Sequence, residues 1–574
     1  MRVFVAIIII ITTGIIRSTV AANFNQCFDA IRNGTYGPSG GVDIRGQPVQ
    51  NIAQAVGMTY GLCKSACGTS PESFDWSEFA QKFTSWLLPW LALISQLPFG
   101  AKYRVDNLTA MLLAVGSPTL AAYSLILTIL NGQWAARRFS NVSYPNYHHA
   151  FRIMNSLQQA PLQITNESSL LSSLVVLPEN DEWWSDLVER LDYTHTWSIS
   201  ASTAIVWVFT AYIFTVVDSF ATLKDEPQAS ADDGQAVGSA WLWLLPIVIA
   251  WLQISPKCDS KRLENAILRT NAIAYVAVPN GSVASLASAK SEARAFTFRN
   301  SESTIYDDAE CSAPIFNYAR FLSWTQNVEA VVSAFHSASH WAKQHKPVDP
   351  RRPWKDGDKD HPIHPDNRRG SEEQVEKYCT PHTEVMRSHW GPNVLSRFLL
   401  ASFVALSLQW GTTGAAIIIL WYTPTVGLGC RSGSYLVYAA ASTLVWMLLV
   451  ISSILTHYVS PRHSYPDQHR SLDHHFMFMD SIAEVLAIML RRLGKLLAAC
   501  NAAWIVLACL LQFSNFCSRC YCNSCATSLG RRAYTVVMTS ASDVWTPWVS
   551  GVSLGCACVV LFVGFVNIFI NPNP

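Results

Sequence analysis

The sequence predicts an all-α polytopic membrane protein with seven or eight transmembrane helices. Half of its 574 residues are hydrophobic and only 14% are charged, against about 25% charged in an average soluble domain. Apolar stretches approach the roughly 20 residues that a helix needs to cross a bilayer. Tryptophans lie near the ends of several stretches, as interfacial belts require: Trp241, Trp251, Trp421 and Trp548. The net charge of +1 gives no general attraction to nucleic acid, so no nucleic-acid partner is expected.

Residues 1–22 are expected to form a cleaved signal peptide. Arg2 precedes an apolar run from Val3 to Ile16, and small residues follow up to Ala22. The alternative is an uncleaved signal anchor, although the run is short for a span. Either way we expect a secretory-pathway membrane, with the plasma membrane as the final location.

Seven apolar stretches are predicted to span the membrane: Leu108–Asn131, Ile199–Val217, Ser239–Ile254, Phe398–Trp421, Tyr435–His457, Leu497–Phe513 and Trp548–Ile570. The predicted division of the chain is a signal peptide (1–22), a cysteine-bearing N-terminal ectodomain (23–82), a short apolar segment plus a transmembrane helix (83–131), a soluble loop (132–198), a transmembrane pair (199–254), a large inter-span soluble domain (255–397), a second transmembrane pair (398–457), an amphipathic helix plus a transmembrane helix (458–513), a cysteine-rich loop (514–547) and a last transmembrane helix with the C-terminus (548–574). Within the large domain, the spacing of Val328, Val331, Val332 and Phe335 predicts a helix.

An eighth apolar segment, Phe83–Phe99, decides the orientation. It is short and contains Pro89 and Pro98. If it crosses, a cleaved signal places the large loops in the lumen, whereas the excess of Lys and Arg beside those loops predicts that they are cytosolic. The two arguments agree if Phe83–Phe99 does not cross, so seven spans with cytosolic large loops are favoured, and eight spans stay open.

Cysteines form the first candidate site. The run FCSRCYCNSC contains Cys517, Cys520, Cys522 and Cys525, and the ectodomain adds Cys27, Cys63 and Cys67. In the lumen these residues are expected to form disulfides, whereas cytosolic thiols beside a span would be candidates for lipidation. A zinc site is disfavoured because a single residue separates the two C-x2-C pairs, which is cramped for wrapping one ion. A luminal ectodomain also makes the sequon at Asn33 a predicted glycosylation site.

Histidines are the second candidate. His336 and His340 share one helical face, and His469, His474 and His475 form a second group. Such pairs resemble the boxes of membrane di-iron enzymes, in which imidazoles hold the metal. Exposed histidines in polar segments explain the same pattern, so we predict neither a metal nor another cofactor.

The third candidate is a substrate path inside the bilayer, because broken helices mark such paths in carriers. Polar interruptions occur at Gly116 and Pro118 in one span, and at Gln409, Gly411, Thr412 and Gly414 in another. Helix packing through small residues explains them equally well. The sequence contains no phosphate loop, zinc-protease motif or nucleophile elbow, so no catalytic residue is predicted and we lean against an enzyme.

Three stretches carry a resemblance. WLLPWLALISQLPFGA (86–101), APIFNYARFLSWTQ (313–326) and QWGTTGAAIIILWYTPTVGLGCRSG (409–433) resemble an uncharacterised family of large multi-pass membrane proteins from filamentous fungi. The resemblance covers most of the chain from about Cys27 to the last span. It implies a fungal membrane protein of the secretory pathway and carries over no functional residue.

These observations favour a non-enzymatic scaffold or receptor-like protein. Its expected partners are the lipid bilayer and unidentified proteins that bind the soluble loops. The alternatives are a channel or carrier for a small molecule, and a histidine-ligated membrane metalloenzyme.

Overall fold

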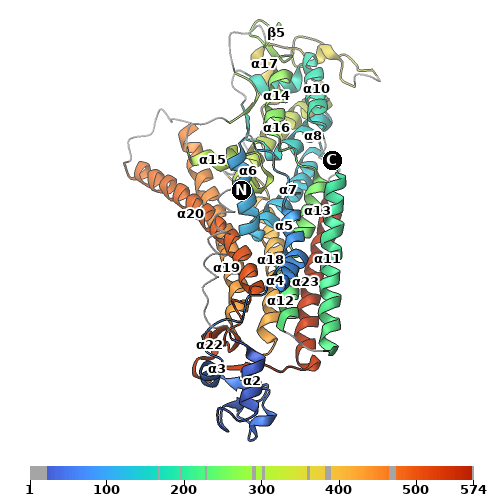
Figure 1. Ribbon diagram of the computed structural model, residues 1–574. Helices are drawn as coiled ribbons and strands as arrows, with labels where there is room; N and C mark the ends of the chain where they lie inside the picture. The colour runs from blue at the N-terminus through green and yellow to red at the C-terminus, as the bar shows by residue number, and fades with distance from the viewer. Residues whose placement is uncertain are drawn as a thin grey trace.

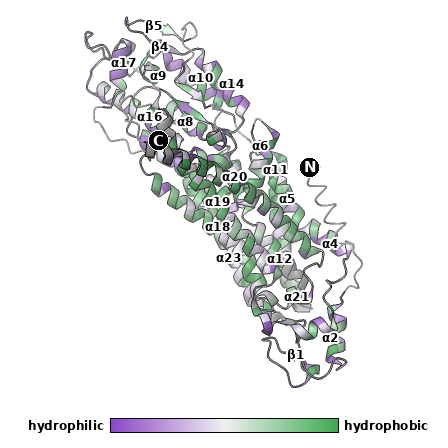
Figure 2. Ribbon diagram, turned by 90° about the vertical axis from the view of Figure 1, so that its left-hand side faces the viewer, coloured by the Kyte–Doolittle hydropathy of each residue, from purple (hydrophilic) through white to green (hydrophobic). Residues whose placement is uncertain are grey.

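The computed structural model describes residues 22–101, 103–165, 169–193, 197–225, 229–286, 293–299, 304–358, 362–381, 390–464 and 474–571. The predicted signal peptide therefore lies outside the described residues, except for Ala22. The chain is mostly helical and forms an elongated molecule (Figure 1). Figure 2 shows hydrophobic residues concentrated in the middle of its length and hydrophilic residues more frequent towards the end that carries α14 and α17.

Three parts follow one another along the molecule. We call residues 22–75 together with 514–540 the cysteine unit, and the described residues of 140–193 and 257–381 the large unit. The apolar helices between them form the helix layer. In Figure 1 the cysteine unit occupies the end that carries α2, α3 and α22, and the large unit occupies the opposite end, which carries α10, α14 and α17.

The cysteine unit joins segments far apart in the sequence. Its elements are α2 (Phe24–Arg32), β1 (Gly41–Val42), η1 (Ile52–Gln54), β2 (Gly57–Thr59), α3 (Tyr60–Ala66), α21 (Cys520–Asn523), α22 (Ala526–Leu529), η9 (Gly530–Arg532) and β7 (Tyr534–Val536). The strands form an antiparallel sheet in the order β1-β2-β7, with Met58 opposite Thr535. The predicted ectodomain and the predicted cysteine-rich loop therefore fold together.

The helix layer contains seven apolar helices from the middle and the second half of the described chain: α11 (Ile199–Asp225), α12 (Ala229–Trp241), α13 (Leu244–Ile254), α18 (Val394–Tyr422), α19 (Cys430–Ser464), α20 (His474–Phe513) and α23 (Ala541–Phe569). In the described residues, six segments are long and apolar enough to cross a membrane, or seven if one bent helix pair counts as a span. The predicted all-α fold with several helices of membrane-spanning length is thus confirmed. The predicted amphipathic helix and the span after it form one continuous helix, α20.

The segment around Phe83–Phe99 runs the length of the layer. It forms α4 (Trp76–Lys82), the π-helical turn η2 (Phe83–Leu87) and α5 (Leu88–Ile94). Before it, the Glu72 amide donates to Ser518 O in the cysteine unit; after it, Gly100 O accepts from the Ser260 amide in the large unit. The segment favoured as non-crossing in the sequence therefore connects the two ends of the molecule.

A bent helix pair replaces the predicted span Leu108–Asn131. It consists of α6 (Arg104–Gly116) and α7 (Pro118–Phe139), which meet at 104°. The bend has a local cause, because proline disfavours a helical conformation at the preceding residue, and Ser117 adopts φ −143° and caps α7 by accepting from the Leu120 amide.

Both outer ends of this pair lie at the large-unit end. The Ala101 amide, next to Gly100, donates to Asn107 in α6, and Phe139 packs edge-on against Phe335 of the large unit. The bend itself lies within the layer, where Ser117 contacts α19. The pair therefore enters the layer and returns to the same end. The layer is traversed by the α4–α5 segment instead.

The large unit is one helical body built from two predicted regions. Its elements are α8 (Tyr147–Ser156), η3 (Leu157–Gln159), β3 (Leu162–Ile164), α9 (Leu170–Val176), η5 (Pro178–Asn180), α10 (Asp181–Leu191), α14 (Ser260–Asn271), β4 (Tyr275–Ala277), β5 (Val283–Ser285), β6 (Phe296–Phe298), η6 (Thr304–Tyr306), α15 (Asp307–Glu310), η7 (Pro314–Phe316), α16 (Asn317–Lys343), η8 (Pro365–Arg368) and α17 (Glu372–Cys379). Strand β3 pairs with β6, and β4 pairs with β5. Trp183 and Trp184 of α10 are fully buried in the common core, which reaches α16. The helix predicted around Val328 is α16.

Candidate functional site

Disulfides organise the cysteine unit. In the described residues Cys27 pairs with Cys67, Cys63 with Cys520, and Cys430 with Cys522. The second pair joins the N-terminal segment to the loop after α20, and the third joins that loop to the start of α19. Five of the seven predicted cysteines are thus in disulfides, and their sulfurs are closed to lipidation.

Cys517 and Cys525 are not in disulfides, although they occupy matching positions in the run. Each lies three residues from a disulfide-bonded cysteine, Cys517 before Cys520 and Cys525 after Cys522. Cys525 is buried and donates to Thr425 O at 3.3 Å, and burial raises the pKa of its thiol to about 11. Cys517 is half-buried. The two thiols therefore differ in access.

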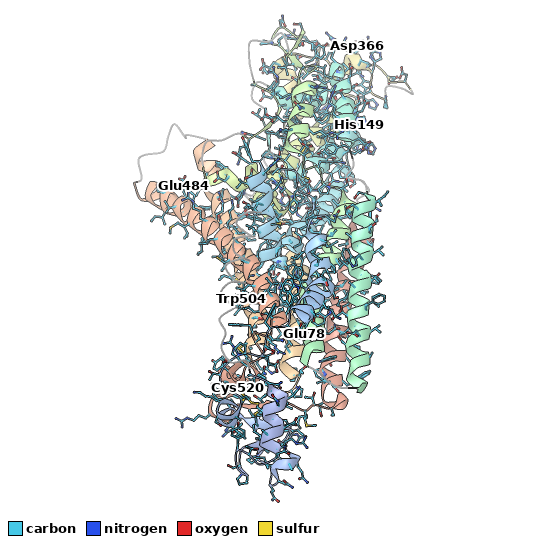
Figure 3. The ribbon with its side chains drawn as sticks, in the orientation of Figure 1. Glu78, His149, Asp366, Glu484, Trp504 and Cys520 are labelled. Atoms are coloured by element: carbon cyan, nitrogen blue, oxygen red, sulfur yellow. A yellow bond between two sulfur atoms is a disulfide. The ribbon has the colours of Figure 1, made fainter. Side chains whose placement is uncertain are left out.

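A cavity of about 490 Å³ opens between the cysteine unit and the helix layer. Four cysteines line it: Cys430, Cys517, Cys520 and Cys522. Its other walls are mainly aromatic or aliphatic, including Trp504 of α20, with a few polar side chains such as Gln512 and the cations Lys64 and Arg519 at the same cavity. Figure 3 places Cys520 in the cysteine unit and Trp504 in the adjoining part of the layer. The cavity thus combines sulfur, aromatic surface and positive charge.

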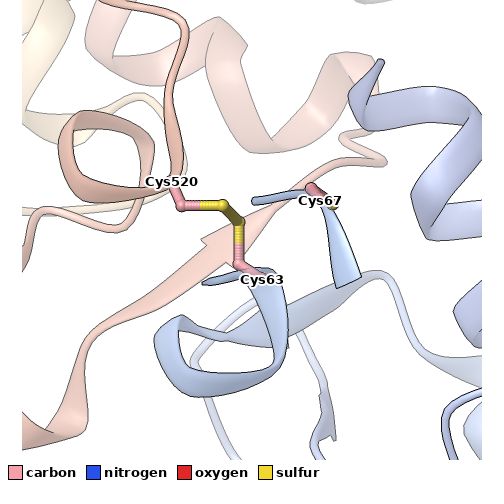
Figure 4. A group of neighbouring side chains, drawn as sticks. All are labelled: Cys63, Cys67 and Cys520. Atoms are coloured by element: carbon pink, nitrogen blue, oxygen red, sulfur yellow. A yellow bond between two sulfur atoms is a disulfide. The ribbon is translucent and has the colours of Figure 1, made fainter. Parts of the chain in front are cut away.

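The sulfurs of Cys63, Cys67 and Cys520 lie within 4.8 Å of one another (Figure 4). This spacing would suit a metal ion if all three were thiolates, because zinc binds deprotonated cysteine. Here Cys63 and Cys520 form one disulfide and Cys67 belongs to another. The geometry therefore brings two disulfides side by side.

The histidine candidates do not converge in the described part of the chain. His336 and His340 lie on the exposed face of α16, where His340 Nε2 lies 2.7 Å from Gln344 Nε2. His474 and His475 lie in the first turn of α20, and His469 lies outside the described residues. The predicted glycosylation site, Asn33, lies in the cysteine unit, where it is exposed at the C-terminus of α2.

Among the predicted substrate-path residues of α18, Gln409 is linked to the bend of the α6–α7 pair through Ser442. Ser117 Oγ donates to Ser442 O at 2.7 Å, and Ser442 Oγ lies 3.4 Å from Gln409 Oε1. Gln409 also donates to Thr413, and Asn501 donates to Gly116 O at 2.7 Å. Gln409 lies near the middle of α18. Two sequence interruptions that lie far apart in the chain thus form one polar network inside the layer.

This polar network is buried and does not line an open path through the helix layer. Ser117, Gln409, Ser442 and Asn501 are each at most 3% exposed. Thr412 is also buried, and its hydroxyl bonds back to Leu408 O in its own helix. Pro118 is likewise buried at the start of α7. Hydrogen bonds among these groups satisfy polar atoms that would otherwise be costly in an apolar layer.

The three predicted glycines, Gly116, Gly411 and Gly414, differ in the space that surrounds them. A Cβ at Gly116 would lie 2.0 Å from Ala498 O, and one at Gly411 would lie 2.2 Å from Cys558 Sγ. A Cβ at Gly414 would meet nothing within 4 Å. Gly116 and Gly411 are therefore explained by the close approach of helices, whereas the packing gives no reason for glycine at 414.

The sequence did not reveal a buried charge cluster near the middle of α20. Asp308 of α15 is fully buried and forms ion pairs with Lys495 and, at 3.7 Å, with Arg491. The Tyr318 hydroxyl donates to the same carboxylate. Arg491 and Lys495 are conspicuous in the sequence, but nothing local marks Asp308 as their partner. This cluster fixes the large unit to α20.

A second cavity, of about 720 Å³, lies beside this cluster, and it was also missed. It is lined mainly by aromatic and aliphatic side chains of α16, α18 and α19, including Tyr318, Phe321 and Phe398, and by Trp390, which precedes α18. Its walls come from segments too far apart in the sequence to suggest a common site.

Comparison of the chain with protein-family models, with curated proteins and with solved structures gives no match. The helices of membrane-spanning length define the class of the protein, and its function is inferred from its own geometry.

Proposed function

We propose that the chain is a receptor-like protein of a secretory-pathway membrane, with the cysteine unit on the luminal or extracellular side and the large unit in the cytosol. The observation that carries the proposal is the placement of two folded units at opposite ends of an apolar helix layer. The unit with the disulfides would meet partners outside, and the large unit would meet partners inside.

The outer surface of the layer supports a lipid environment. In α11 and α23 only 17% of the most apolar window is buried within the chain. Their exposed side chains include Trp207, Phe214, Val560 and Leu561. Such a broad apolar surface is typical of a membrane-embedded region.

Two independent arguments give the same orientation. Disulfides persist in oxidising compartments, and those in the described residues all lie at the cysteine unit. Cytosolic ends of spans are rich in Lys and Arg, and Arg138, Arg491 and Lys495 form ion pairs with acidic residues of the large unit. A returning α6–α7 pair together with a crossing α4–α5 segment would reconcile these arguments without a non-crossing Phe83–Phe99.

A continuous connection between the units favours a receptor over a passive anchor. The C-terminal end of α20 continues into the loop that contains disulfide-bonded Cys520 and Cys522. Further back in the same helix, Arg491 and Lys495 form ion pairs with Asp308 of the large unit. Helix α19 packs along α20 and begins at disulfide-bonded Cys430. A shift of the cysteine unit would therefore be transmitted along this helix pair.

Glycan mapping tests the orientation. The full chain would be expressed in yeast, and microsomes treated with endoglycosidase. We expect a glycan that is lost in Asn33→Gln and unaffected by Asn280→Gln, since Asn280 lies in the large unit. A glycan at Asn280 would place the large unit in the lumen and overturn the proposed orientation.

Hydrogen exchange tests the connection. Asp308→Asn leaves Lys495 and Arg491 without their carboxylate, so α20 is expected to shift. If the connection operates, amide protection changes at β7 in the cysteine unit as well as around α15. Glu329→Gln is the matched control, because Glu329 pairs with Arg138 at a more exposed site. A change confined to the large unit would contradict the receptor-like function and favour a scaffold of independent units.

A small-molecule carrier is the second candidate, favoured by the helix break and polar network within the layer. Substituted-cysteine labelling distinguishes it. With Ser442→Cys, a water-filled path predicts modification by a membrane-impermeant maleimide, detected by peptide mass spectrometry. The closed network predicts no modification at this position.

A further inference from the structure

We propose that the cavity of about 720 Å³ between α16, α18 and α19 binds a neutral membrane lipid that carries a hydroxyl group. Sterols and diacylglycerols are the two sources of this chemistry in a membrane. The hydroxyl of Tyr123 is assigned as the hydrogen-bond partner of the lipid. This inference goes beyond the receptor-like function and uses only the location of the helix layer in a membrane.

The cavity has the size and the lining of a lipid site. Its volume falls within the range of about 300–1,000 Å³ that ligand pockets occupy. Its walls are mainly aromatic or aliphatic, with rings from Tyr318, Phe321 and Phe398 and aliphatic side chains from Val450 and Ile454. Such walls contact the apolar body of a ligand, and a small number of polar groups then fixes its orientation.

The lining favours a ligand without charge. Among the described residues, the set that lines this cavity contains no Asp, Glu, Lys or Arg. Arg397 lies behind the wall, with its guanidinium carbon 4.9 Å from the centroid of the Phe321 ring. Its guanidinium donates to Asn131 and Thr325. A phosphate or carboxylate inside the cavity would therefore be buried without a counter-charge, which is costly.

The hydroxyl groups of the lining point to one position for a polar contact. The Tyr318 hydroxyl donates to Asp308, and Ser453 Oγ donates to Tyr318 O at 2.7 Å. Ser396 Oγ donates at 3.0 Å to the backbone oxygen three residues before it. Tyr123 also lines the cavity and is only 1% exposed, yet within the described residues its hydroxyl forms no hydrogen bond. Buried polar groups are nearly always bonded, so this hydroxyl calls for a partner inside the cavity.

Packing explains the ring of Tyr123 but not its hydroxyl. The ring packs edge-on against Phe398, with the ring centroids 6.1 Å apart, and against Trp446, with the centroids 6.0 Å apart. A phenylalanine would make both contacts equally well. The two contacts hold the ring in place, so the hydroxyl is positioned before a ligand enters, which lowers the entropic cost of binding.

The cavity is continuous with the outer surface of the helix layer. Leu395 of α18 lines the cavity and is 67% exposed. Leu399 and Phe403 follow at four-residue spacing on the same face of the helix, and both are exposed. In a membrane this apolar stripe would contact lipid tails. A lipid can therefore enter the cavity sideways from the bilayer, without passing through water.

Photolabelling tests the site. The full chain, purified in detergent, would be irradiated with diazirine-bearing analogues of cholesterol, of dioleoylglycerol and of phosphatidylserine, and the labelled peptides mapped by mass spectrometry. We expect the sterol or the diacylglycerol probe to label the cavity-lining segments 318–322 and 394–398, and the more efficient probe identifies the source. Labelling by neither neutral probe, or equal labelling by the anionic one, would overturn the proposal.

Competition tests the role of Tyr123. Unlabelled lipid, either cholesterol or dioleoylglycerol, would compete with its own photoprobe, next to the matched analogue that lacks the hydroxyl. In the wild type the hydroxyl-bearing lipid should compete about fivefold better, the effect of one neutral hydrogen bond. Tyr123→Phe should abolish this preference. Retention of the preference in Tyr123→Phe, or its absence in the wild type, would overturn the assignment and leave water as the partner of the hydroxyl.

Tyr438→Phe is the matched control for competition. Tyr438 is also fully buried in the helix layer, but its hydroxyl donates to Val115 O at 2.8 Å and it does not line the cavity. The preference should persist in this variant, and its loss would contradict a specific contact at Tyr123. Both measurements are independent of membrane orientation and of the Asp308 connection, so their failure would leave the receptor-like function unaffected.

Discussion

The cysteine unit and the large unit are stabilised by different means: the first mainly by disulfides and the second by a large apolar core. Among the residues that the structure describes, the buried apolar cluster of the cysteine unit has eight members, two of them disulfide-bonded cysteines. The large unit buries a far larger cluster that includes two adjacent tryptophans, and Cys379 in its core is not in a disulfide. A small body cannot remove enough apolar surface from water to fold on burial alone, so it relies on covalent staples. Reducing conditions should therefore lower the stability of the cysteine unit while leaving that of the large unit unchanged.

A substitution in its apolar core should destabilise the large unit most. Trp184 is fully buried, donates its indole N–H to Leu174 O at 2.8 Å and packs edge-on against Phe335. Trp184→Ala is expected to destabilise the unit by about 3–5 kcal/mol, since it removes a large side chain and leaves a cavity. Hydrogen exchange of α16 amides would measure the loss, with the exposed residue Leu268 as the Leu268→Ala control. Equal loss in the cysteine unit would contradict the independence of the two cores.

Removal of a disulfide should destabilise the cysteine unit most. Cys27–Cys67 closes a loop with a sequence separation of 40 residues. Replacing both cysteines by serine should cost roughly 3–4 kcal/mol on the chain-entropy model of disulfide stabilisation. Limited proteolysis of the N-terminal segment would report the loss, and dithiothreitol should reproduce it. Under both conditions the large unit should stay protected; its simultaneous cleavage would mean that the units share one stability.

The helix layer between the units extends the comparison, because in the described residues one disulfide, Cys430–Cys522, anchors the start of α19 and the interior of the layer is held by close contacts between helices. Gly411→Ala introduces a methyl group against Cys558 and should cost about 1–3 kcal/mol through overpacking. Gly414→Ala fills open space and should be neutral or slightly stabilising, since alanine is the better helix former. Thermal aggregation of the two variants in detergent would compare them. Equal loss would mean that the packing at Gly411 is not the determining contact.

The membrane class and the helical segments were predictable because periodicity and apolar length are local properties of the sequence. The bend at Ser117 was signalled by Pro118, yet its 104° angle depends on the contacts with Ala498 and Ser442. The cysteine run was visible as a site, but its pairing was not, because the partners of Cys520 and Cys522 lie 457 and 92 residues away. Asp308 was undetectable for the same reason: an acidic residue in a polar segment shows no sign of its burial.

A pH-dependent difference is the smallest effect expected, and it concerns two acidic residues of the cysteine unit. Burial raises the pKa of Glu72, whereas hydrogen bonds from Ser77 and from the Glu78 amide lower the pKa of Asp75. A carboxyl whose pKa is raised by folding adds stability that is present below its unfolded pKa and is lost as the pH rises through the folded value. A lowered pKa has the opposite consequence, with stability present above the unfolded value and lost as the pH falls through the folded one.

Glu72→Gln should therefore make the cysteine unit more stable at neutral pH and weaken the gain that the wild type shows as the pH falls towards about 4–5, near the reference pKa of glutamate. Asp75→Asn keeps a side-chain oxygen that can cap α4 but removes the charge, so it should lower stability at neutral pH and weaken the loss in acid. Exchange of β2 amides between pH 4 and 7, corrected for intrinsic rates, measures both. Parallel shifts in the two variants would show that net charge, rather than the burial of Glu72, governs the pH dependence of this unit. Opposite shifts would place the origin in the burial of the Glu72 carboxyl and in the hydrogen bonds to Asp75.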